Sequence, residues 1–279
     1  MQRLSTMAQW EAKGKTFLVT GGASGLGAAF VEAFLSEGAK KVAILDIAED
    51  VGKAKAESLN KIHGDKVIFV KCDVSKEEEI TSAFDQVVSR FERVDVLINN
   101  AGIMVDAPDV WRTACNVNWE GVVSFSMKCI KHMRKDEGGA GGTIINMSSN
   151  AGLLRFPLLP IYSGSKIAVL HFTQSISMPP FYERTGIRML TMCPGPTDTP
   201  LLQGLEKRGY NVQTGKELAD SVVQMNTVFQ KVESMVVAFI HMFKNGAPGS
   251  IWLSLKDKPA LDITSIVEKA FMAFEEIAI

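Results

Sequence analysis

The sequence of 279 residues predicts an α/β protein with a doubly wound parallel sheet of about seven strands, in a single domain that ends in a C-terminal helix. Two observations predict this class. Short runs rich in apolar and β-branched residues alternate with amphipathic stretches along nearly the whole chain. The runs are almost continuously apolar, which is typical of parallel strands covered by helices on both faces. Strand–helix–strand repetition then implies right-handed crossovers.

Seven segments are expected to be strands. In chain order they are residues 16–20, 41–46, 67–71, 94–99, 143–148, 187–193 and 250–255. Helices lie between them, and the pattern over 76–91 is a clear example, with Ser75 expected to cap it and one apolar stripe facing the core. A longer helix begins near Pro160 and ends near Met178, just before two prolines interrupt it.

Two regions depart from this rhythm. Residues 196–215 are rich in Pro, Gly and Thr and are expected to form a long excursion, either a functional lid or a disordered loop. Residues 263–277 carry apolar side chains at helical spacing, for which core burial is expected, with a subunit contact or a cover over the substrate pocket as alternatives. The chain is therefore divided into a domain at 14–255, which includes the lid, and a helical extension at 256–279.

Composition narrows the class of partner. Apolar residues make up 46% of the chain, charged residues 22%, and the formal net charge is −1, so a nucleic-acid or anionic membrane surface is not the expected partner. No apolar run reaches the length of a membrane span, and the first residues lack a signal-peptide core. The four cysteines are scattered and the four histidines isolated, which predicts reduced thiols, a cytoplasmic location and no metal site.

A glycine-rich turn follows the first strand in the run TGGASGLG, at residues 20–27. Glycine allows a sharp turn and brings backbone N–H groups close to a ligand, and the helix N-terminus that follows attracts a pyrophosphate. A glycine-rich turn can also be a turn without any ligand. Its position between a strand and a helix in the first βα unit favours a dinucleotide site.

Asp46 ends the second strand. A carboxylate there accepts hydrogen bonds from the adenosine ribose hydroxyls and repels a 2′-phosphate. Neither Ser24 nor Ile47 supplies an arginine for that phosphate, so NAD is preferred over NADP. The alternative is that Asp46 only caps the next helix.

A second polar group lies further along the chain. Tyr162 and Lys166 are at positions i and i+4 of a predicted helix, so the ammonium lies on the same face as the phenol. A nearby cation favours the phenolate of a tyrosine whose pKa is otherwise near 10. Ser149 ends the fifth strand and is expected to hold the substrate oxygen. Ser148 is the neighbouring candidate, and strand alternation would point the two side chains in opposite directions. Asn118 is a polar residue in an apolar helical stretch.

Together these residues resemble the short-chain dehydrogenase/reductase family, whose members have a Rossmann fold. The resemblance covers roughly residues 14–255 and is most specific as an ordered set: TGGASGLG, Asp46, Cys72-Asp73-Val74, NNAG at 99–102, Asn118, Ser149, Tyr162, Lys166 and Pro194-Gly195. Within the family the chain is most similar to the NAD-dependent 15-hydroxyprostaglandin dehydrogenase group, with insect alcohol dehydrogenases nearby.

The resemblance implies the role of each catalytic residue. Tyr162 would be the general base in oxidation and the general acid in reduction. Lys166 would lower the tyrosine pKa and hold the nicotinamide ribose. Ser149 would position the substrate oxygen, and Asn118 would support a water-linked proton path.

The resemblance also implies the cofactor contacts. Around NAD they would be Gly21, Gly25, Leu26 and Gly27 near the pyrophosphate, Asp46 on the ribose, Asp73 and Val74 at the adenine, Asn100 at the adenosine side, Tyr162 and Lys166 at the nicotinamide, and Pro194, Thr197 and Thr199 near the carboxamide. A homodimer or homotetramer is implied, with helices near 110–134 and 160–178 packed across a two-fold axis.

The chain departs from the pattern where it bears on the substrate. Relatives commonly have Val or Ile at the position of Thr197, a change that a backbone anchor tolerates. The prostaglandin enzymes carry a substrate-contacting glutamine where this chain has Leu159, so prostaglandin is not inferred as the substrate. If several of the apolar residues near the site face it, the site suits a hydrophobic secondary alcohol; otherwise these residues belong to the core. They are Leu153, Leu154, Phe156, Leu158, Leu159, Leu201 and Leu202. The expected activity is NAD-dependent oxidation of such an alcohol, with a carbonyl reductase or a non-catalytic NAD-binding scaffold as alternatives.

Overall fold

The computed structural model describes residues 10–224 and 229–278. Its centre is one eight-stranded sheet in the order β3-β2-β1-β4-β5-β6-β7-β8, parallel except for β8. The strands are β1 Thr16–Thr20, β2 Lys41–Asp46, β3 Val67–Lys71, β4 Val96–Asn99, β5 Gly142–Met147, β6 Ile187–Pro194, β7 Ile251–Ser254 and β8 Leu261–Asp262. The predicted parallel sheet is confirmed, and its seven expected strands match to within two residues.

The eighth strand was not predicted. It pairs antiparallel with β7, through Trp252 with Asp262 and Leu253 with Leu261. With two residues, both exposed, it is too short to show a strand periodicity in the sequence. It belongs to the sheet although it lies beyond residue 255.

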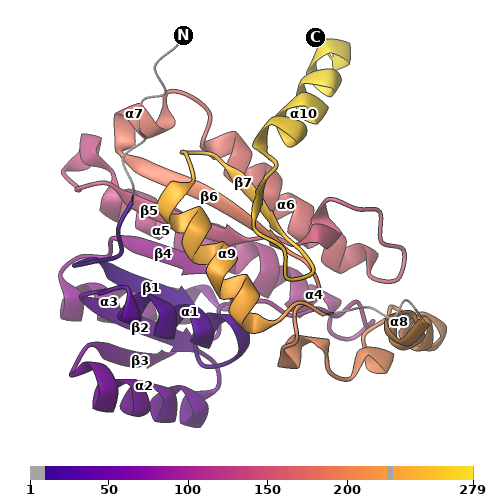
Figure 1. Ribbon diagram of the computed structural model, residues 1–279, viewed down its shortest axis with the longest axis horizontal. Helices are drawn as coiled ribbons and strands as arrows, with labels where there is room; N and C mark the ends of the chain where they lie inside the picture. Colours follow the sequence, from indigo (N-terminus) through magenta and orange to yellow (C-terminus); the bar gives the residue numbers. More distant parts are fainter. Residues whose placement is uncertain (1–9, 225–228, 279) are drawn as a thin grey trace.

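Helices cover both faces of the sheet (Figure 1). The helices are α1 Gly25–Ser36, α2 Glu49–His63, α3 Glu77–Phe91, α4 Trp111–Cys115, α5 Gly121–Met133, α6 Pro160–Ile176, α7 Phe181–Thr185, α8 Val212–Gln224, α9 Val232–Asn245 and α10 Thr264–Ala278. On one face α1, α2 and α9 form a core that includes stacked Phe30 and Phe239, with ring centroids 3.9 Å apart. On the other face α3 and α5 form a second core. The doubly wound prediction is confirmed.

The strand order creates the place for a site. From β1 the chain proceeds outward to β2 and β3, then returns to β4 on the other side of β1. Loops that leave β1 and β4 therefore diverge to opposite faces, and a crevice opens at the carboxyl ends of these strands. The two runs of sequence singled out above, 20–27 and 99–102, both lie there.

The predicted cap of α3 is wrong. The helix begins at Glu77, its N-cap residue is Lys76, and the N-cap side chain makes no capping hydrogen bond. The Ser75 hydroxyl instead donates to Asp73 Oδ1 at 2.7 Å, and its N–H bonds the same oxygen at 3.0 Å. The Asp73 carboxylate outcompetes the helix for Ser75 because it is a charged acceptor two residues away.

The C-terminal helix only partly meets expectation. Ile263 and Val267 are buried against Leu170 and Ile251, so the beginning of α10 packs on the domain. Farther along, Phe274 and Ile277 are exposed, and Figure 1 shows this end of α10 extending away from the body. Core burial of the whole stripe is therefore wrong, because the helix passes the edge of the sheet and residues 10–224 and 229–278 do not cover its far end.

Region 196–215 contains short helical turns rather than an unstructured loop. They are η4 at Pro200–Leu202 and η5 at Leu205–Lys207, and α8 starts at Val212 within the predicted lid. The backbone of Thr197 pairs with that of Gln230, so the far side of α8 returns to the root of the excursion. The excursion and α8 therefore start and end at the same place, close to the end of β6.

Candidate active site

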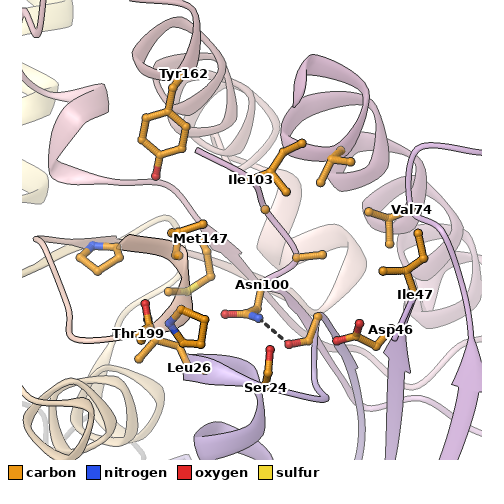
Figure 2. Close-up of a pocket in the computed structure, with 18 of the residues that line it drawn as sticks. Ser24, Leu26, Asp46, Ile47, Val74, Asn100, Ile103, Met147, Tyr162 and Thr199 are labelled. Carbon is orange, nitrogen blue, oxygen red and sulfur yellow. Dashed lines mark hydrogen bonds between the residues drawn. The ribbon is translucent and has the colours of Figure 1, made fainter. Parts of the chain in front are cut away.

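A cavity of about 430 Å³ opens at the carboxyl ends of the central strands. Figure 2 shows Asp46, Ile47 and Val74 toward one end and Tyr162 toward the other. Of the predicted site residues, those lining the cavity are Gly21, Gly25, Leu26, Asp46, Asp73, Val74, Asn100, Tyr162, Lys166, Pro194 and Thr199. Four others, Gly27, Asn118, Ser149 and Thr197, do not line it but lie on segments that build its wall.

The glycine-rich turn forms the floor of the cavity. Gly21 and Gly25 have positive φ angles of 63° and 52°, a region that glycine adopts without strain. A Cβ on Gly27 would overlap the carbonyl oxygen of Gly21, so this position needs glycine for packing. Helix α1 begins at Gly25, and the N–H groups of its first turn therefore have no acceptor within the helix. Such a terminus suits a phosphate.

Asn100 ties the end of β4 to this turn. Its Nδ2 donates to the carbonyl oxygens of Thr20 and Gly21 at 3.0 and 3.1 Å, and its N–H donates to Thr20 Oγ1 at 3.0 Å. Figure 2 shows the bond to Gly21. The side chain thus holds the two halves of the crevice in register while it faces the cavity.

Asp46 does more than cap the next helix. Its Oδ2 accepts from the Ala23 N–H and its Oδ1 from the Ala48 N–H, each at 3.0 Å. One oxygen therefore orders the glycine-rich turn, and the other orders the start of α2. The carboxylate lines the cavity beside the exposed Ile47. No cation occupies the Ile47 position, as the sequence indicated.

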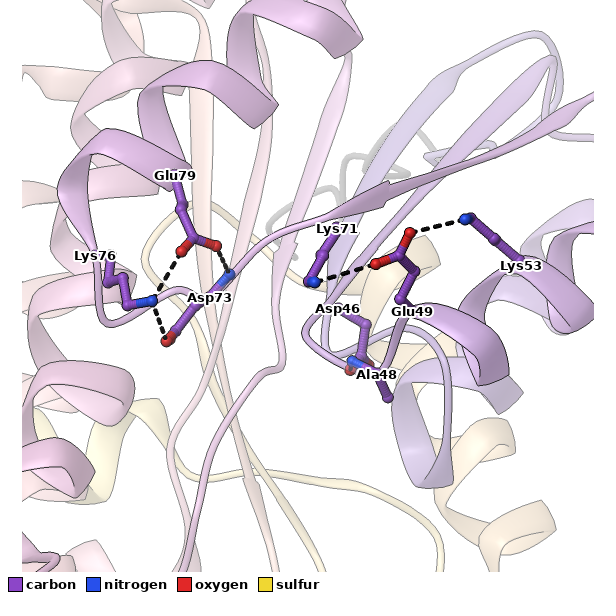
Figure 3. Close-up of polar contacts among 8 residues, drawn as sticks. All are labelled: Asp46, Ala48, Glu49, Lys53, Lys71, Asp73, Lys76 and Glu79. Carbon is purple, nitrogen blue, oxygen red and sulfur yellow. Dashed lines mark hydrogen bonds and ion pairs between the residues drawn. The ribbon is translucent and has the colours of Figure 1, made fainter.

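The basic side chains around this end are paired with acids, as Figure 3 shows. Glu49 takes both Lys53 at 2.7 Å and Lys71 at 3.0 Å, and hydrogen bonds to these two ammonium groups hold its pKa below the usual range. Lys76 contacts Glu79 at 2.9 Å and Asp73 at 3.5 Å. The ammonium groups drawn there are therefore already partnered by carboxylates.

Tyr162 and Lys166 meet in the interior, as their spacing predicted. Both are almost fully buried, and Lys166 Nζ lies 5.8 Å from the centre of the Tyr162 ring. Nζ donates to the Met147 carbonyl oxygen at 3.0 Å, which fixes the ammonium at the end of β5. Burial raises the pKa of Tyr162, and the nearby Ser149 hydroxyl opposes that rise. Burial lowers the pKa of Lys166 to about 8.

The two serines after β5 contact different groups of α6. Ser148 Oγ donates to the Lys166 carbonyl oxygen at 2.7 Å and holds α6 against the strand. Ser149 Oγ accepts from the Ala151 N–H at 3.1 Å and lies beside the Tyr162 phenol. Ser149 therefore lies next to the phenol. Ser148, the neighbouring candidate, is the serine that lines the cavity.

Asn118 lies behind the cavity. It is fully buried in a π-helical turn, Asn116–Glu120, that joins α4 to α5. Its Oδ1 accepts from the Ile103 N–H at 2.9 Å, and its Nδ2 donates to the Ile103 carbonyl at 2.8 Å and to Ser165 Oγ at 3.2 Å. A Cβ on Gly102 would meet both Asn118 Oδ1 and Lys166 Nζ, at 3.2 and 3.4 Å. Asn118 thus approaches the lysine across a glycine.

Thr197 turns away from the cavity. Its hydroxyl donates to the Gly195 carbonyl oxygen at 2.9 Å and accepts from Gln230 Nε2 at 2.8 Å. The neighbouring Pro194 and Thr199 line the wall. Only backbone groups of Thr197 remain for a ligand, which agrees with the tolerance expected at this position.

Sequence reasoning missed part of the wall. The additional lining residues are Ser24, Ile47, Cys72, Ala101, Gly102, Ile103, Thr113, Val117, Met147, Ser148, Pro200 and Leu201. Several of these residues lie within the quoted motifs or next to them, and this place in the sequence is a usable signal. They are Ser24, Ile47, Cys72, Ala101, Gly102 and Ser148. Thr113 and Val117 carry no such signal, because only the approach of α4 to the crevice brings them there.

An apolar cluster surrounds Tyr162. Its buried members are Met104, Leu159, Tyr162, Leu205 and Leu218, with Ala151, Phe156, Leu158, Leu202 and Ala219 packed against them. Leu159 and Phe156 are therefore placed beside the tyrosine as expected. Leu153 packs instead in the cluster near α10, and Leu154 is exposed. The loop after Ser149 turns these two away from the site.

Three further features can be read from the described residues, namely metal-ligand geometry, membrane-spanning helices and cysteine pairing. Within residues 10–224 and 229–278, no group of three or more His, Cys, Asp or Glu side chains has a geometry that could hold a metal ion. None of the helices in the same ranges is long and apolar enough to cross a membrane. All four cysteines are free thiols.

The fold and the crevice define a class of nucleotide-binding oxidoreductase, and comparison with known proteins supplies the family. Residues 15–209 match the family model for short chain dehydrogenases. The 15-hydroxyprostaglandin dehydrogenase (NAD(+)) of Mus musculus is 41% identical over 195 residues, 70% of this chain and 71% of that enzyme. Alcohol dehydrogenase 1 of Ceratitis cosyra is 30% identical over 242 residues, 86% of this chain and 91% of that enzyme.

A solved structure agrees with the fold. The NADPH-dependent 3-quinuclidinone reductase from Rhodotorula rubra superposes with a TM-score of 0.73 at 26% identity, covering 91% of this chain and 94% of that one. The chain belongs to the short-chain dehydrogenase family, and it is an oxidoreductase of that family. The resemblance stated from the motifs is confirmed.

Proposed function

We propose that this protein is an NAD-dependent dehydrogenase that oxidises a hydrophobic secondary alcohol to a carbonyl by hydride transfer, with Tyr162 as the general base. One observation carries the proposal. The buried group of Tyr162, Lys166 and Ser149 stands at one end of a single cavity whose other end holds Asp46. A dinucleotide bound along this cavity with its adenosine ribose at Asp46 would have its nicotinamide on the tyrosine side, where it would supply hydride chemistry.

The residues present fit NAD. The glycine-rich turn and the start of α1 would hold the pyrophosphate, Asp46 the adenosine ribose, and Asp73 and Val74 the adenine. Asn100 would contact the adenosine side. Lys166 would hold the nicotinamide ribose, with Pro194, Thr199 and the Thr197 backbone at the carboxamide. When bound, NAD supplies the acceptor for the hydride that leaves the alcohol carbon.

NAD is favoured over NADP by charge. Asp46 points a carboxylate into the adenosine end, and a 2′-phosphate there would meet its negative charge at close range. The ammonium groups of Lys53, Lys71 and Lys76 are engaged by acids. The named relatives include an NAD(+) enzyme and an NADPH enzyme, so the assignment depends on the residues of this chain.

Proton transfer falls to the buried triad. Tyr162 Oη would take the proton of the substrate hydroxyl as the hydride departs, and Ser149 Oγ would hold the same oxygen. Burial disfavours the phenolate, so the phenol needs compensating positive charge. Lys166, whose Nζ lies 5.8 Å from the centre of the Tyr162 ring, would supply that charge. We propose that Asn118 holds the Gly102–Ile103 backbone beside the ammonium and supports the path by which the proton leaves.

The apolar cluster around Tyr162 supports a hydrophobic substrate. Leu159, Leu202 and Leu205 present hydrocarbon next to the tyrosine. A polar substrate such as a sugar would lose its water hydrogen bonds there without replacement. Leu159, which is buried in this cluster, also offers no side-chain amide at the position where the prostaglandin enzymes carry a glutamine.

Two other functions are separable by experiment. A carbonyl reductase on the same scaffold would run the reaction in reverse from NAD(P)H, with Tyr162 as the acid. A non-catalytic scaffold would bind NAD without turnover, and the presence of Ser149, Tyr162 and Lys166 speaks against it.

We also propose how the chain is organised. Residues 14–255 would form the catalytic unit with 196–215 as its lid, and 256–279 a helical extension. A homodimer or homotetramer would form through α5 and α6, where Met127 and Ile167 are exposed apolar side chains. Free cysteines support a cytoplasmic location, because reducing compartments keep thiols unpaired.

The test is a parallel assay with NAD and NADP across hydrophobic and polar alcohols, read as absorbance of the reduced cofactor. We expect turnover with NAD on hydrophobic alcohols and a loss of about 10²–10⁴-fold in Tyr162→Phe, the usual value of a positioned acid–base group. Tyr182→Phe, on α7 and outside the lining of the cavity, is the matched control. Binding of NAD without turnover in either direction would favour the scaffold, and turnover confined to sugars would contradict the apolar pocket.

A further inference from the structure

The catalytic helix α6 begins without a local cap. The residue before it, Leu159, is apolar and fully buried, and no side chain caps the helix from that position. Pro160 has no N–H to donate. The N–H groups of Ile161 and Tyr162 are thus the first donors of the helix, and they lie where water does not reach freely. A buried helix end of this kind needs acceptors from elsewhere in the chain.

Asp106 provides both acceptors. Its Oδ2 accepts from the Ile161 N–H at 2.7 Å and its Oδ1 from the Tyr162 N–H at 2.8 Å. The side chain is 1% exposed. Burial raises the pKa of the Asp106 carboxyl, and the hydrogen bonds from the Ile161 and Tyr162 N–H groups oppose that rise. Asp106 comes from the loop after β4, more than fifty residues away in sequence. The sequence next to α6 therefore does not predict this cap.

The loop that carries Asp106 is held from its other side. The Asp106 N–H donates to the Arg208 carbonyl oxygen at 2.7 Å. The Arg208 guanidinium donates in turn to the Met104 carbonyl oxygen at 3.1 Å. Arg208 lies in the 196–215 excursion, and Met104 packs in the apolar cluster with Tyr162. Asp106 is thus fixed between the excursion and the first turn of α6.

We propose that Asp106 is a positioning residue for Tyr162, which rests on the proposed role of Tyr162 as the base. The carboxylate fixes the first turn of α6, and Tyr162 is the third residue of that helix. The phenol is thereby placed against Ser149 and the reacting end of the cavity. Asp106 does not line the cavity, so it acts only through the helix. Misplacement of a reacting group by about 1 Å can cost about 100-fold in rate.

The alternative is that Asp106 only stabilises the fold. Loss of a structural cap would lower the free energy of unfolding and leave the turnover number of the folded protein unchanged. Loss of a positioning cap would lower kcat in protein that is still folded and still binds NAD. The two cases therefore differ in kcat measured at a temperature where every variant is folded.

The test is Asp106→Asn, which keeps the size of the side chain but leaves one oxygen to accept one of the two N–H groups. The matched control is Asp109→Asn, a residue of the same loop with an exposed side chain. We expect kcat to fall about 10- to 100-fold in Asp106→Asn, with an unchanged dissociation constant for NAD. Hydrogen exchange at the Ile161 and Tyr162 amides should accelerate. Asp109→Asn should match the wild type in all three measurements.

Each result decides the matter. Faster amide exchange with an unchanged kcat overturns the inference, and so does a parallel loss of kcat and NAD affinity that follows the loss of folded protein. If Asp106→Asn does not fold, Arg208→Met tests the loop that carries Asp106, because it removes the hydrogen bond from the Arg208 guanidinium to the Met104 carbonyl oxygen. This variant should lower kcat several-fold. An unchanged kcat overturns the inference. Wild-type protein without turnover overturns the proposed function as well; turnover abolished by Tyr162→Phe but unaffected by Asp106→Asn overturns this inference alone.

Discussion

Lys166 is an ammonium group enclosed by protein, with one carbonyl oxygen within hydrogen-bond reach. Its pKa is lowered by burial to about 8 from an ordinary value of 10.5. Between these values the unfolded chain binds a proton that the folded chain does not, so the free energy of unfolding rises with pH in that window. Below about pH 8 both states are protonated, and the desolvation cost is carried in full.

Lys166→Met is therefore expected to stabilise the protein while it removes activity. The gain in unfolding free energy over the wild type should be largest at about pH 7 and smaller at about pH 9.5, because the wild type loses its penalty as the lysine deprotonates. Urea unfolding at the two pH values measures it. Lys216→Met, on the exposed face of α8, should show no such pH-dependent difference. An equal gain at both pH values would contradict the assigned cause.

The residue scale also shows what the local sequence can and cannot predict. The proximity of Tyr162 and Lys166 was predictable because a helix places residues i and i+4 side by side. The position of Asp46 in the cavity wall was predictable because it ends a strand at the carboxyl edge of the sheet. Asp106 was not, because its partners are backbone N–H groups that a different part of the chain brings to it. A carboxylate in a loop carries no mark of such a role.

At the scale of elements, the glycine-rich turn depends on one close approach. Gly27 lies in the first turn of α1 and packs against the carbonyl oxygen of Gly21. A Cβ added to Gly27 would lie 2.6 Å from the Asn100 amide nitrogen. That amide cannot retreat without releasing its bonds to Thr20 and Gly21. A methyl group here therefore separates α1 from the end of β4.

Gly27→Ala is expected to lower the free energy of unfolding by about 1–3 kcal/mol, the usual cost of overpacking, and to weaken NAD binding. Gly164→Ala is the matched control, because Gly164 lies in α6 with open space around it. Alanine there should stabilise the protein by up to about 1 kcal/mol through helix propensity. Denaturant unfolding and titration with NAD measure both variants. Unchanged NAD affinity in Gly27→Ala would contradict the assigned role of the turn.

Elements also show where sequence patterns mislead. The stripe of α10 has the periodicity of a buried helix, yet Phe274 and Ile277 are exposed. Periodicity reports that a face is apolar and not what covers it. The α3 cap was missed for a related reason, since Ser75 had a nearer charged partner in Asp73.

At the scale of the whole molecule, the exposed apolar side chains of α5 and α6 bear on assembly. Met127 is 49% exposed on α5 and Ile167 39% exposed on α6. Val237, 70% exposed on α9, lies on a helix that covers the opposite face of the sheet. The two faces can therefore be tested against each other.

Sedimentation velocity is expected to show a dimer or tetramer for the wild type. Met127→Asp should shift the distribution toward smaller species, because a charge placed in an apolar interface is desolvated without a partner. Val237→Asp should leave the sedimentation coefficient unchanged. A wild-type monomer at working concentration would contradict the proposed assembly, and an equal shift by both variants would contradict its location on α5 and α6.

The sequence by itself determined the parallel sheet, the strand positions and the motifs at both ends of the crevice. Each of these depends on local periodicity or on residues within one turn of a strand or helix. Only the tertiary structure decided that Thr113, Val117 and Met147 complete the wall of the cavity and that Asp106 caps α6. It also decided that the far end of α10 is left exposed by the described residues. These depend on segments far apart in the chain, whose approach is set by packing of the whole domain and leaves no pattern in either segment alone.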